Sequence, residues 1–414
     1  MSVSTEIHQD AKLIELVKRL ALEGYAGPAK PQFESREKYK WLRDQGSRIW
    51  LDTGELAAAG KVWSTELEAL TTNNTLVNQV VSTGAMDGAI AYAAGKIKEL
   101  HPDIPRNALV MEIAFLINAR LALSLIAHLG ALVSVELHPG VGFDVERTVA
   151  YARRYYAINP THFYVKVPLT PDGFLSVRRL SAEGIPVNYT LGFSARQNYL
   201  AARFSKPAFV NVFLGRLNQV VETNGLGRPE SIGEKTTLAS QEAVAKLRQT
   251  AGIPTQQIAA SLRNGLQVAA LAGVDVLTIP PKAAGEYLEM DVKKDDVRKH
   301  TSAELSVDLD QAHASEVARF WEIDDKFVAF VDDAVKQADS MTSGRDLVAL
   351  SNKHGVNLFK DWSADDRRKL REAGKIPDIS QWPGAPLDDL MSMSALESFA
   401  KDQMELDERI AGMV

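Results

Sequence analysis

Lys166 stands inside the apolar run FYVKVP, and the run VNYTL, which carries Asn188 and Thr190, follows 22 residues later. An ammonium group buried in a β-type run without a partner is strongly unfavourable, and holding the lysine neutral relieves that cost. A neutral, desolvated lysine amine attacks carbonyl carbon. The pattern therefore predicts Schiff-base chemistry on a carbonyl substrate.

Carboxylates stand in two other apolar runs. Because side chains alternate along a strand, Lys166, Asn188 and Thr190 share the inner face of a barrel, and their valine neighbours lie on the outer face. The same phase turns Glu136 inward, and Asp52 stands near the end of the first run. Asp52 suits the base that takes a hydroxyl proton in aldol cleavage, and Glu136 with Thr190 and a water suits a proton shuttle.

Residues suited to an oxyanion come later in the chain. Arg216 stands just past the run FVNVFL, and Ser261 and Arg263 are two positions apart around the end of the run QIAASL. Guanidinium groups of fixed fork geometry bind phosphate well. These residues predict a phosphate site, with surface ion pairs as the alternative for both arginines.

Eight short β-rich runs, separated by helical stretches, would position these residues. Two of the helical stretches follow Asp144 and Ser194, which can cap them. Strands that alternate with helices predict an α/β protein with a (β/α)8 barrel, in which reactive side chains gather at the carboxyl ends of the strands. An open doubly wound sheet is the alternative, but the chain lacks its glycine-rich fingerprint. The runs are residues 48–53, 69–73, 132–137, 163–168, 186–191, 209–214, 257–262 and 274–280.

Changes in composition and periodicity along the chain predict three parts. Residues 1–46 form an N-terminal helical segment, 47–290 the barrel, and 291–414 a charged α-helical extension. The C-terminal helices either cover the barrel mouth or form a subunit contact. The sequence does not fix the oligomeric state, and a homo-oligomer is one alternative. The first helix is expected over residues 4–25, with Ser4 or Thr5 as its cap and an apolar stripe of Leu13, Val17, Leu20 and Ala21.

Composition excludes several classes of function. The formal net charge of −6, from 47 basic and 53 acidic residues, argues against nucleic acid or an anionic membrane as a partner. The absence of cysteine excludes disulfides, thiolate catalysis and cysteine-ligated metals. We expect no apolar run to reach the length of a membrane span, about 18 residues. The start MSVSTEIHQD does not resemble a signal peptide. A cytoplasmic location is expected.

The histidines do not indicate a metal site. The eight histidines lack the HxH or HxxxH spacing of zinc ligands. His138 is expected on the same face as Glu136, and the two would supply two ligands without a third. A metal is therefore not expected, and lysine Schiff-base chemistry implies no organic cofactor.

Eight segments match, in order, the motifs of a known family, and together they span about residues 48–285. Each motif alone is weak, but their order makes the match specific. On them the chain resembles the transaldolase family, class I enzymes built on an eight-stranded barrel, in the long bacterial-type form. The segments are WLDTGEL, LTTNNTL, VSVEL, VKVPLT, GIPVNYTLGFS, FVNVFLGRL, AASLRN and GVDVLTIPP.

The resemblance implies a role for each candidate residue. Lys166 matches the Schiff-base lysine, Asp52 the acid/base carboxylate, and Glu136 with Thr190 the proton-relay pair. The substrate-binding residues are Asn73 and Asn188 for the hydroxyls of a dihydroxyacetone unit, and Arg216, Ser261 and Arg263 for the phosphate.

Phe213 and three departures from the family pattern bear on the substrate. Transferring members tend to have Phe at this position, whereas the related fructose 6-phosphate aldolases have Tyr, so Phe213 indicates transfer. Asn211 and Val212 stand where the family usually has Ser-Pro, and Asn211 is expected to face inward beside the donor hydroxyls. Asn74 replaces the usual Pro after Asn73, which is expected to loosen that turn.

The activity implied by the resemblance is a transfer in the pentose phosphate pathway. A dihydroxyacetone unit passes from sedoheptulose 7-phosphate or fructose 6-phosphate to glyceraldehyde 3-phosphate or erythrose 4-phosphate, so sugar phosphates are the expected partners. A specialised relative acting on an unusual or sulfonated ketose is one alternative, suggested by Asn211. A barrel without turnover that binds sugar phosphates is another.

Overall fold

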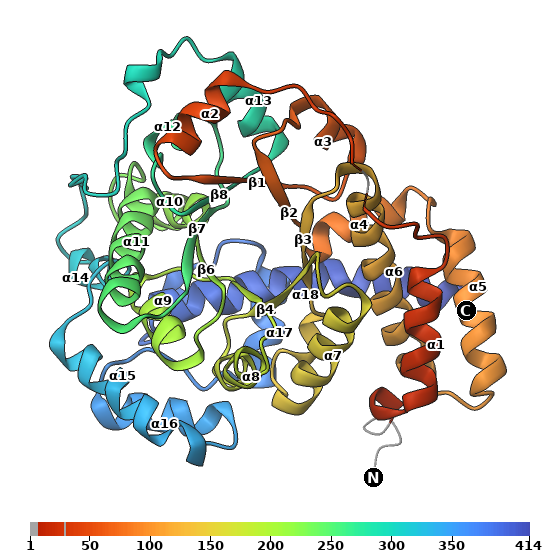
Figure 1. The fold of residues 1–414 in the computed structure, drawn as a ribbon. Helices are drawn as coiled ribbons and strands as arrows, with labels where there is room; N and C mark the ends of the chain where they lie inside the picture. The colour runs from red at the N-terminus through yellow and green to blue at the C-terminus, as the bar shows by residue number, and fades with distance from the viewer. Residues whose placement is uncertain (1–6, 29) are drawn as a thin grey trace.

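The computed structural model describes residues 7–28 and 30–414 and shows a closed barrel of eight parallel strands in sequence order (Figure 1). All eight predicted runs form these strands, so the predicted (β/α)8 class is confirmed. The strands are β1 (Arg48–Asp52), β2 (Leu67–Thr71), β3 (Leu132–Glu136), β4 (Phe163–Pro168), β5 (Val187–Thr190), β6 (Phe209–Phe213), β7 (Gln256–Ala260) and β8 (Val276–Ile279).

Helices follow every strand and surround the barrel (Figure 1). Asp144 and Ser194 cap two of them as predicted, since Asp144 accepts from Arg147 N at 2.9 Å and Ser194 from Gln197 N at 3.1 Å. The helices are α1 (Ala11–Leu22), α2 (Glu37–Asp44), α3 (Leu56–Val62), α4 (Asn74–Ser82), α5 (Asp87–Leu100), α6 (Arg106–Leu129), α7 (Val145–Ile158), α8 (Pro171–Ala182), α9 (Ala195–Leu200), α10 (Leu214–Thr223), α11 (Ile232–Ala251), α12 (Gly265–Ala270), α13 (Pro281–Glu289), α14 (Ala314–Ala318), α15 (Asp325–Gln337), α16 (Gly344–His354), α17 (Ala364–Ala373) and α18 (Leu387–Met413).

The first α-helix starts later than predicted. The expected caps Ser4 and Thr5 lie outside the described residues. Within them, α1 begins at Ala11, because the side chain of Asp10 accepts from the backbone N–H groups of Lys12 and Leu13. The four residues of the predicted apolar stripe are all buried.

Aromatic side chains fill the amino end of the barrel. Trp50 lies with its ring centroid 5.7 Å from that of Tyr164 and 4.7 Å from that of Phe209, and the Arg48 guanidinium lies 5.7 Å from the Trp50 ring. Lys166 stands two positions after Tyr164, so it points to the same interior side, nearer the carboxyl end. The predicted strand phase is thus correct: aromatic rings close one end of the barrel, and polar groups occupy the other.

Helix α6 contradicts the expectation that no apolar run is long enough to span a membrane. Its most apolar 18-residue window has a mean hydropathy of 1.9, so it is long and apolar enough to span a membrane, contrary to the sequence analysis. However, 83% of that window is buried, and α6 packs against α1, α5, α18 and β3. Such burial is typical of a core helix rather than of a lipid-facing one.

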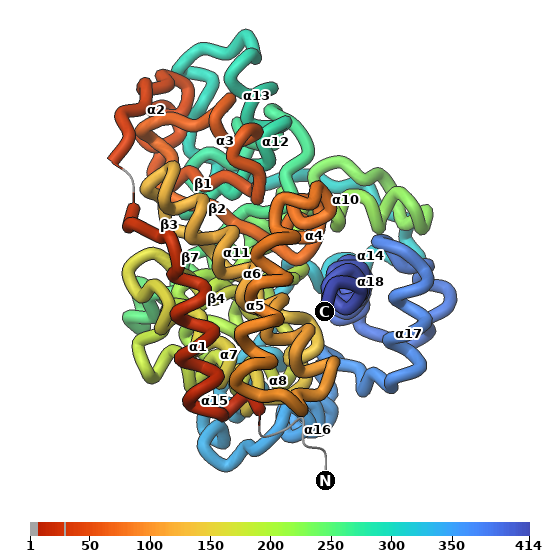
Figure 2. Tube along the Cα trace, turned by 90° about the vertical axis from the view of Figure 1, so that its right-hand side faces the viewer, coloured from red at the N-terminus to blue at the C-terminus, as the bar shows by residue number. Residues whose placement is uncertain are grey.

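The extension after the barrel is helical, as expected. Its first two helices, α14 and α15, are separate, because Asp324 adopts an extended conformation and caps α15 by accepting from Phe327 N at 2.7 Å. The last helix, α18, packs against α4, α6 and α17, and Figure 2 looks almost along its axis. The three-part division of the chain stays a prediction.

Two aspartates in the first turn of α18 anchor that helix, Asp388 to the barrel and Asp389 to the preceding part of the extension. Asp388 accepts from the Arg196 guanidinium at 2.7 and 2.8 Å and from Ser194 Oγ at 2.8 Å. Its neighbour Asp389 accepts from the backbone N of Lys360 and from Trp362 Nε1. Burial raises the pKa of Asp389 to about 7, although these hydrogen bonds oppose the shift.

Candidate active site

A cavity of about 210 Å³ opens at the carboxyl ends of the strands. It gathers every predicted site residue except Glu136 and Thr190, which lie buried next to it in β3 and β5. Side chains from seven of the eight strand ends or the loops after them thus meet at one place, as reactive groups do in barrels of this kind. The predicted residues that line the cavity are Asp52, Asn73, Lys166, Asn188, Asn211, Phe213, Arg216, Ser261 and Arg263.

The Lys166 amine has two partners inside the barrel. Nζ donates to the Thr72 carbonyl oxygen at 2.9 Å and to Glu136 Oε2 at 3.2 Å. The Lys166 and Glu136 side chains are only 4% and 2% exposed, so this is a buried ion pair. The apolar run around Lys166 predicts a lysine without a partner, whereas the parallel register of β3 and β4 places Glu136 beside it. The pair and the hydrogen bonds offset the cost of burial.

Both candidate carboxylates titrate above their ordinary range. Burial raises the pKa of Asp52 and that of Glu136, and the positive charge of Lys166 opposes both shifts. Thr71 Oγ1 donates to Asp52 Oδ1 at 2.7 Å and lies 2.7 Å from Thr278 Oγ1. Since Thr71 donates to the carboxylate, it accepts from Thr278, and the two hydroxyls form a chain that steadies Asp52.

Three buried polar atoms near the cavity lack a hydrogen-bond partner among the described residues. They are Thr190 Oγ1, Asn188 Oδ1 and Arg216 Nη1. The other end of the Asn188 amide donates to Ser134 Oγ at 3.0 Å, so its orientation is fixed. Buried polar groups are normally hydrogen-bonded, and groups left unpaired in a cavity are suited to a polar ligand.

Two arginines, Arg216 and Arg263, make one side of the cavity positive. Burial, with the nearby charge of Arg263, lowers the pKa of Arg216 to about 10, and burial also lowers the pKa of Arg263. Arg216 stands in the first turn of helix α10, which begins at Leu214 without a side-chain cap, so the positive end of the helix dipole adds to this charge. Ser261 holds a left-handed backbone conformation with φ 64°, a strain typical of functional sites.

Asn211 and Asn73 use part of their amides for the fold. Asn211 Oδ1 accepts from Gly192 N at 3.1 Å, and its Nδ2 donates to the Tyr189 carbonyl oxygen. Its amide therefore joins β6 to the end of β5, although the residue lines the cavity as expected. Asn73 caps α4, and Asn74, expected to loosen this turn, is the buried first residue of that helix.

His138 does not share the inner face with Glu136, contrary to the sequence analysis. Strand β3 ends at Glu136, so the alternation stops there, and His138 Nε2 lies 3.0 Å from Asp407 Oδ2 on α18. The described part of the chain contains no cluster of three or more His, Asp or Glu suited to a metal.

Several cavity residues were missed by the sequence analysis. Thr71 and Thr278 stand in strands at positions of the inward phase, so strand alternation alone would have found them. Lys375 and Phe399 come from the C-terminal extension and also line the cavity. No spacing in the sequence relates them to the barrel, because only the path of the extension brings them there.

The comparisons with known proteins agree with this geometry. The sequence model of the family described as Transaldolase/Fructose-6-phosphate aldolase matches residues 49–341, which include all eight strands except the first residue of β1. A probable transaldolase of Thermus thermophilus is 34% identical over 236 residues, which cover 56% of this chain and 86% of that protein. A probable transaldolase of Exiguobacterium sibiricum is 39% identical over 142 residues, covering 34% and 59% respectively. The chain belongs to the transaldolase/fructose-6-phosphate aldolase family and is an enzyme of the transaldolase type.

Proposed function

We propose that this enzyme transfers a dihydroxyacetone unit from a ketose phosphate to an aldose phosphate through a Schiff base on Lys166. The observation that carries the proposal is the placement of the Lys166 amine, which lies 3.2 Å from Glu136 and lines one cavity with Asp52, Arg216 and Arg263. Nucleophile, base and anion site are thus together. Sedoheptulose 7-phosphate or fructose 6-phosphate is the donor, and glyceraldehyde 3-phosphate or erythrose 4-phosphate the acceptor.

The first half-reaction forms and uses an iminium ion. Glu136 takes a proton from the Lys166 ammonium, the neutral amine adds to the C2 carbonyl of the ketose, and the carbinolamine loses water to give the iminium. Asp52 takes the proton of the C4 hydroxyl, the C3–C4 bond breaks, and its electrons move into the iminium to give an enamine. The aldose phosphate leaves. In the second half, the enamine attacks the acceptor aldehyde, Asp52 returns the proton, and water hydrolyses the new iminium.

Proton transfers at the nitrogen fall to Glu136 and Thr190. Glu136 accepts a hydrogen bond from Nζ, and the free Thr190 hydroxyl stands close to the Lys166 strand, since Thr190 pairs with Pro168 in the β4–β5 ladder. With a water between them, they carry protons to and from the carbinolamine. Asn73 and Asn188 hold the hydroxyls of the three-carbon unit.

Transfer is proposed rather than release of free dihydroxyacetone. Phe213 lines the cavity and packs against Phe193 with ring centroids 5.8 Å apart, so it offers no hydroxyl to orient a water near the enamine. Arg216, Ser261 and Arg263 hold the phosphate of the leaving and of the incoming aldose. The reaction belongs to the non-oxidative pentose phosphate pathway, with the cytoplasmic location expected from the sequence.

Borohydride reduction in the presence of fructose 6-phosphate tests the proposal. We expect an adduct of the size of reduced dihydroxyacetone on Lys166 by peptide mass mapping, and no turnover for Lys166→Ala. Lys246→Ala, a change on helix α11, serves as the control and should keep both. Turnover by Lys166→Ala, or an adduct on another lysine, would contradict the proposal.

Binding and reduction experiments on the wild-type protein distinguish the two alternatives. A binding barrel without turnover would bind fructose 6-phosphate and form no reducible adduct. A specialised enzyme for sulfonated ketoses would form the adduct with a sulfonated donor and not with the phosphate. Asn211 suggests this second alternative from the sequence, but both ends of its amide are bonded to the backbone in the structure.

A further inference from the structure

Two side chains from the C-terminal extension line the cavity that holds Lys166. Lys375 stands on the segment between α17 and the short 3-10 helix Ile379–Gln381, and Phe399 stands on α18. Both lie beyond residue 341, where the match to the family ends. The mouth of the cavity is therefore completed by a part of the chain that the family match does not cover.

Three cations around this cavity have no carboxylate partner. Within residues 7–28 and 30–414, neither Arg216, Arg263 nor Lys375 takes part in an ion pair within 4.0 Å. Asp402 on α18 acts on Arg216 from a longer distance, while its own Oδ2 accepts from the Thr75 hydroxyl. Unpaired like charges repel one another, so the cluster is suited to an anion that enters from solvent.

Phe399 packs against Arg216, the buried residue among these three cations. The Arg216 guanidinium carbon lies 5.6 Å from the centroid of the Phe399 ring, a distance at which the ring face attracts a cation. The Arg216 group is 8% exposed as a residue and its Nη1 is unpartnered. The extension thus shields one arginine from water, which strengthens its attraction for an anion.

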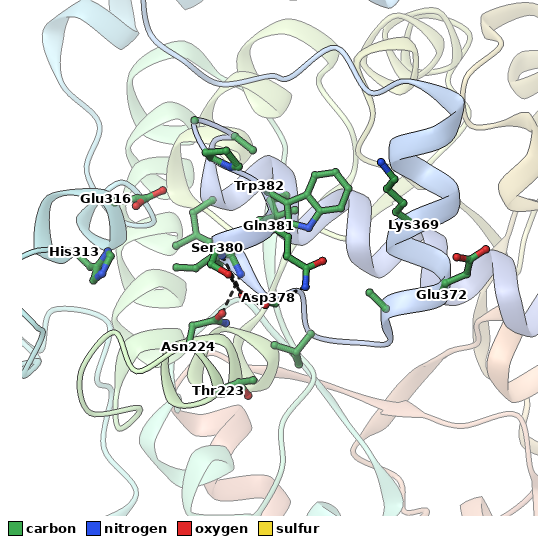
Figure 3. A pocket seen from close by; sticks show the side chains of 18 residues that line it. Thr223, Asn224, His313, Glu316, Lys369, Glu372, Asp378, Ser380, Gln381 and Trp382 are labelled. Carbon is green, nitrogen blue, oxygen red and sulfur yellow. Dashed lines mark hydrogen bonds between the residues drawn. The ribbon is translucent and has the colours of Figure 1, made fainter.

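Asn224 fixes the segment that carries Lys375. Its Nδ2 donates to the Pro377 carbonyl oxygen at 3.1 Å, and its Oδ1 accepts from Ile379 N at 3.0 Å. Asn224 follows the last turn of α10, the helix whose first turn carries Arg216. Figure 3 shows Asn224 beside Asp378 and Ser380, and all three line a second cavity of about 1110 Å³. Lys375 lines the first cavity and its neighbour Ile376 lines the second. Helix α10 carries Arg216 in its first turn, and Asn224 at its end holds the segment of Lys375.

We propose that Lys375 is a specificity-determining residue that binds the terminal phosphate of the sugar at the mouth of the cavity. The two arginines supply rigid forks from the barrel, and Lys375 supplies a third, mobile charge on the solvent side. A phosphate that carries close to two negative charges is matched by this arrangement better than a neutral hydroxyl. The inference rests on the proposed function, because it names the group that this site recognises.

The test compares phosphorylated and unphosphorylated donors. For Lys375→Met we expect KM for fructose 6-phosphate to rise about tenfold with kcat within about twofold, because the charge acts on binding before and during the reaction alike. KM for unphosphorylated fructose should not change, and Lys375→Arg should restore most of the loss. Lys369→Met is the matched control, since that lysine pairs with Asp365 and faces the other cavity.

Asn224→Ala tests the anchoring of the segment. We expect a smaller rise of KM, again confined to phosphorylated donors, and no further effect of Asn224→Ala once Lys375→Met is present. Additive effects of the two changes would show that Asn224 acts elsewhere.

Binding of inorganic phosphate to the whole enzyme gives a readout that does not need turnover. By calorimetry, the wild-type protein should bind phosphate more tightly than Lys375→Met, and the difference should shrink at high salt. Equal affinities, or wild-type KM values for Lys375→Met, would overturn the inference while leaving the Lys166 adduct intact. Failure of the wild-type protein to form that adduct, with the difference in phosphate binding present, would remove the proposed reaction and keep the anion site.

Discussion

The Glu136 carboxylate and the Lys166 amine are held together by strand register. The two residues are paired in the parallel ladder of β3 and β4, and their side-chain atoms lie 3.2 Å apart. Because both stand on strands rather than on loops, the contact does not depend on a movement of the chain. In the proposed reaction, this contact would hold the nucleophile and its proton acceptor in place before the substrate arrives.

Glu136→Gln should slow imine formation about a hundredfold, because glutamine keeps the shape of the side chain and cannot take a proton. The measurement is the rate at which the borohydride-trapped adduct forms in a single turnover. Glu68→Gln is the control, since Glu68 pairs with Arg48 near the amino end of the barrel. An unchanged rate would remove Glu136 from the proton transfers.

The acid limb of the pH profile should report Asp52. Its pKa is raised by burial, and a base must be ionised to act, so kcat should fall as pH drops through a value above the ordinary 3.8. Thr71→Val removes a hydrogen bond that lowers this pKa, so the limb should move to higher pH. Thr278→Val leaves that bond in place and should move it less. A limb that stays fixed in Thr71→Val would contradict the assignment.

Gly215→Ala should damage phosphate recognition. A Cβ at this position would lie within 3.0 Å of the Ser261 carbonyl oxygen and of Arg263 Nε, so Arg263 has to move. We expect KM for fructose 6-phosphate to rise at least tenfold, with KM for unphosphorylated fructose unchanged, and a loss of about 1–3 kcal/mol in unfolding free energy from overpacking. Gly60→Ala is the control, because its Cβ would meet nothing within 4 Å. Equal effects on both substrates would point to general damage.

Asn211→Ser should reduce stability at the seam between β5 and β6. The ladder there pairs only Asn188 with Phe209, and the Asn211 amide adds two bonds to the backbone of Tyr189 and Gly192. Serine is too short to keep both, so we expect a loss of about 1–2 kcal/mol in unfolding free energy by denaturant titration. The ratio of KM values for phosphate and sulfonate donors, measured on the same variant, shows whether Asn211 also selects the donor.

Asp389→Asn should change how stability depends on pH. The folded-state pKa of about 7 lies above the unfolded value of 3.8, so the folded state binds more protons between these values. Stability from this group is complete below about pH 4 and is lost as pH rises to about 7. Asparagine stays neutral and can still accept from Lys360 N and Trp362 Nε1. The variant should gain on the order of 2–3 kcal/mol over the wild type between pH 5 and pH 8, and parallel curves of melting temperature against pH would contradict this.

Much of the barrel could be predicted from the sequence, because each strand is a short apolar run with its own alternation. Lys166, Asn188 and Glu136 were placed on the inner face by that alternation, and the structure puts them there. His138 was wrong because β3 ends two residues earlier, and a strand end is set by its neighbours rather than by the run itself.

The contacts made by the extension could not be predicted in this way. Lys375 and Phe399 reach the cavity because α18 and the segment before it follow a path fixed by Asp388, Arg196 and Asn224. Those anchors join residues more than 150 positions apart, and no local pattern relates them. The contact between Lys166 and Glu136 could not be predicted for a related reason. The register that pairs them is set by how β3 and β4 align in the sheet, and neither run alone determines it.

The aromatic rings of Trp50, Tyr164 and Phe209 have a kinetic consequence. They close the amino end of the barrel, so the cavity is reached from the carboxyl side, beside α18 and Lys375. In the proposed transfer, the aldehyde that leaves and the aldehyde that enters would use this one opening. The first would therefore have to leave before the second binds, and with the three-carbon unit held covalently on Lys166 in between, the expected kinetic order is ping-pong.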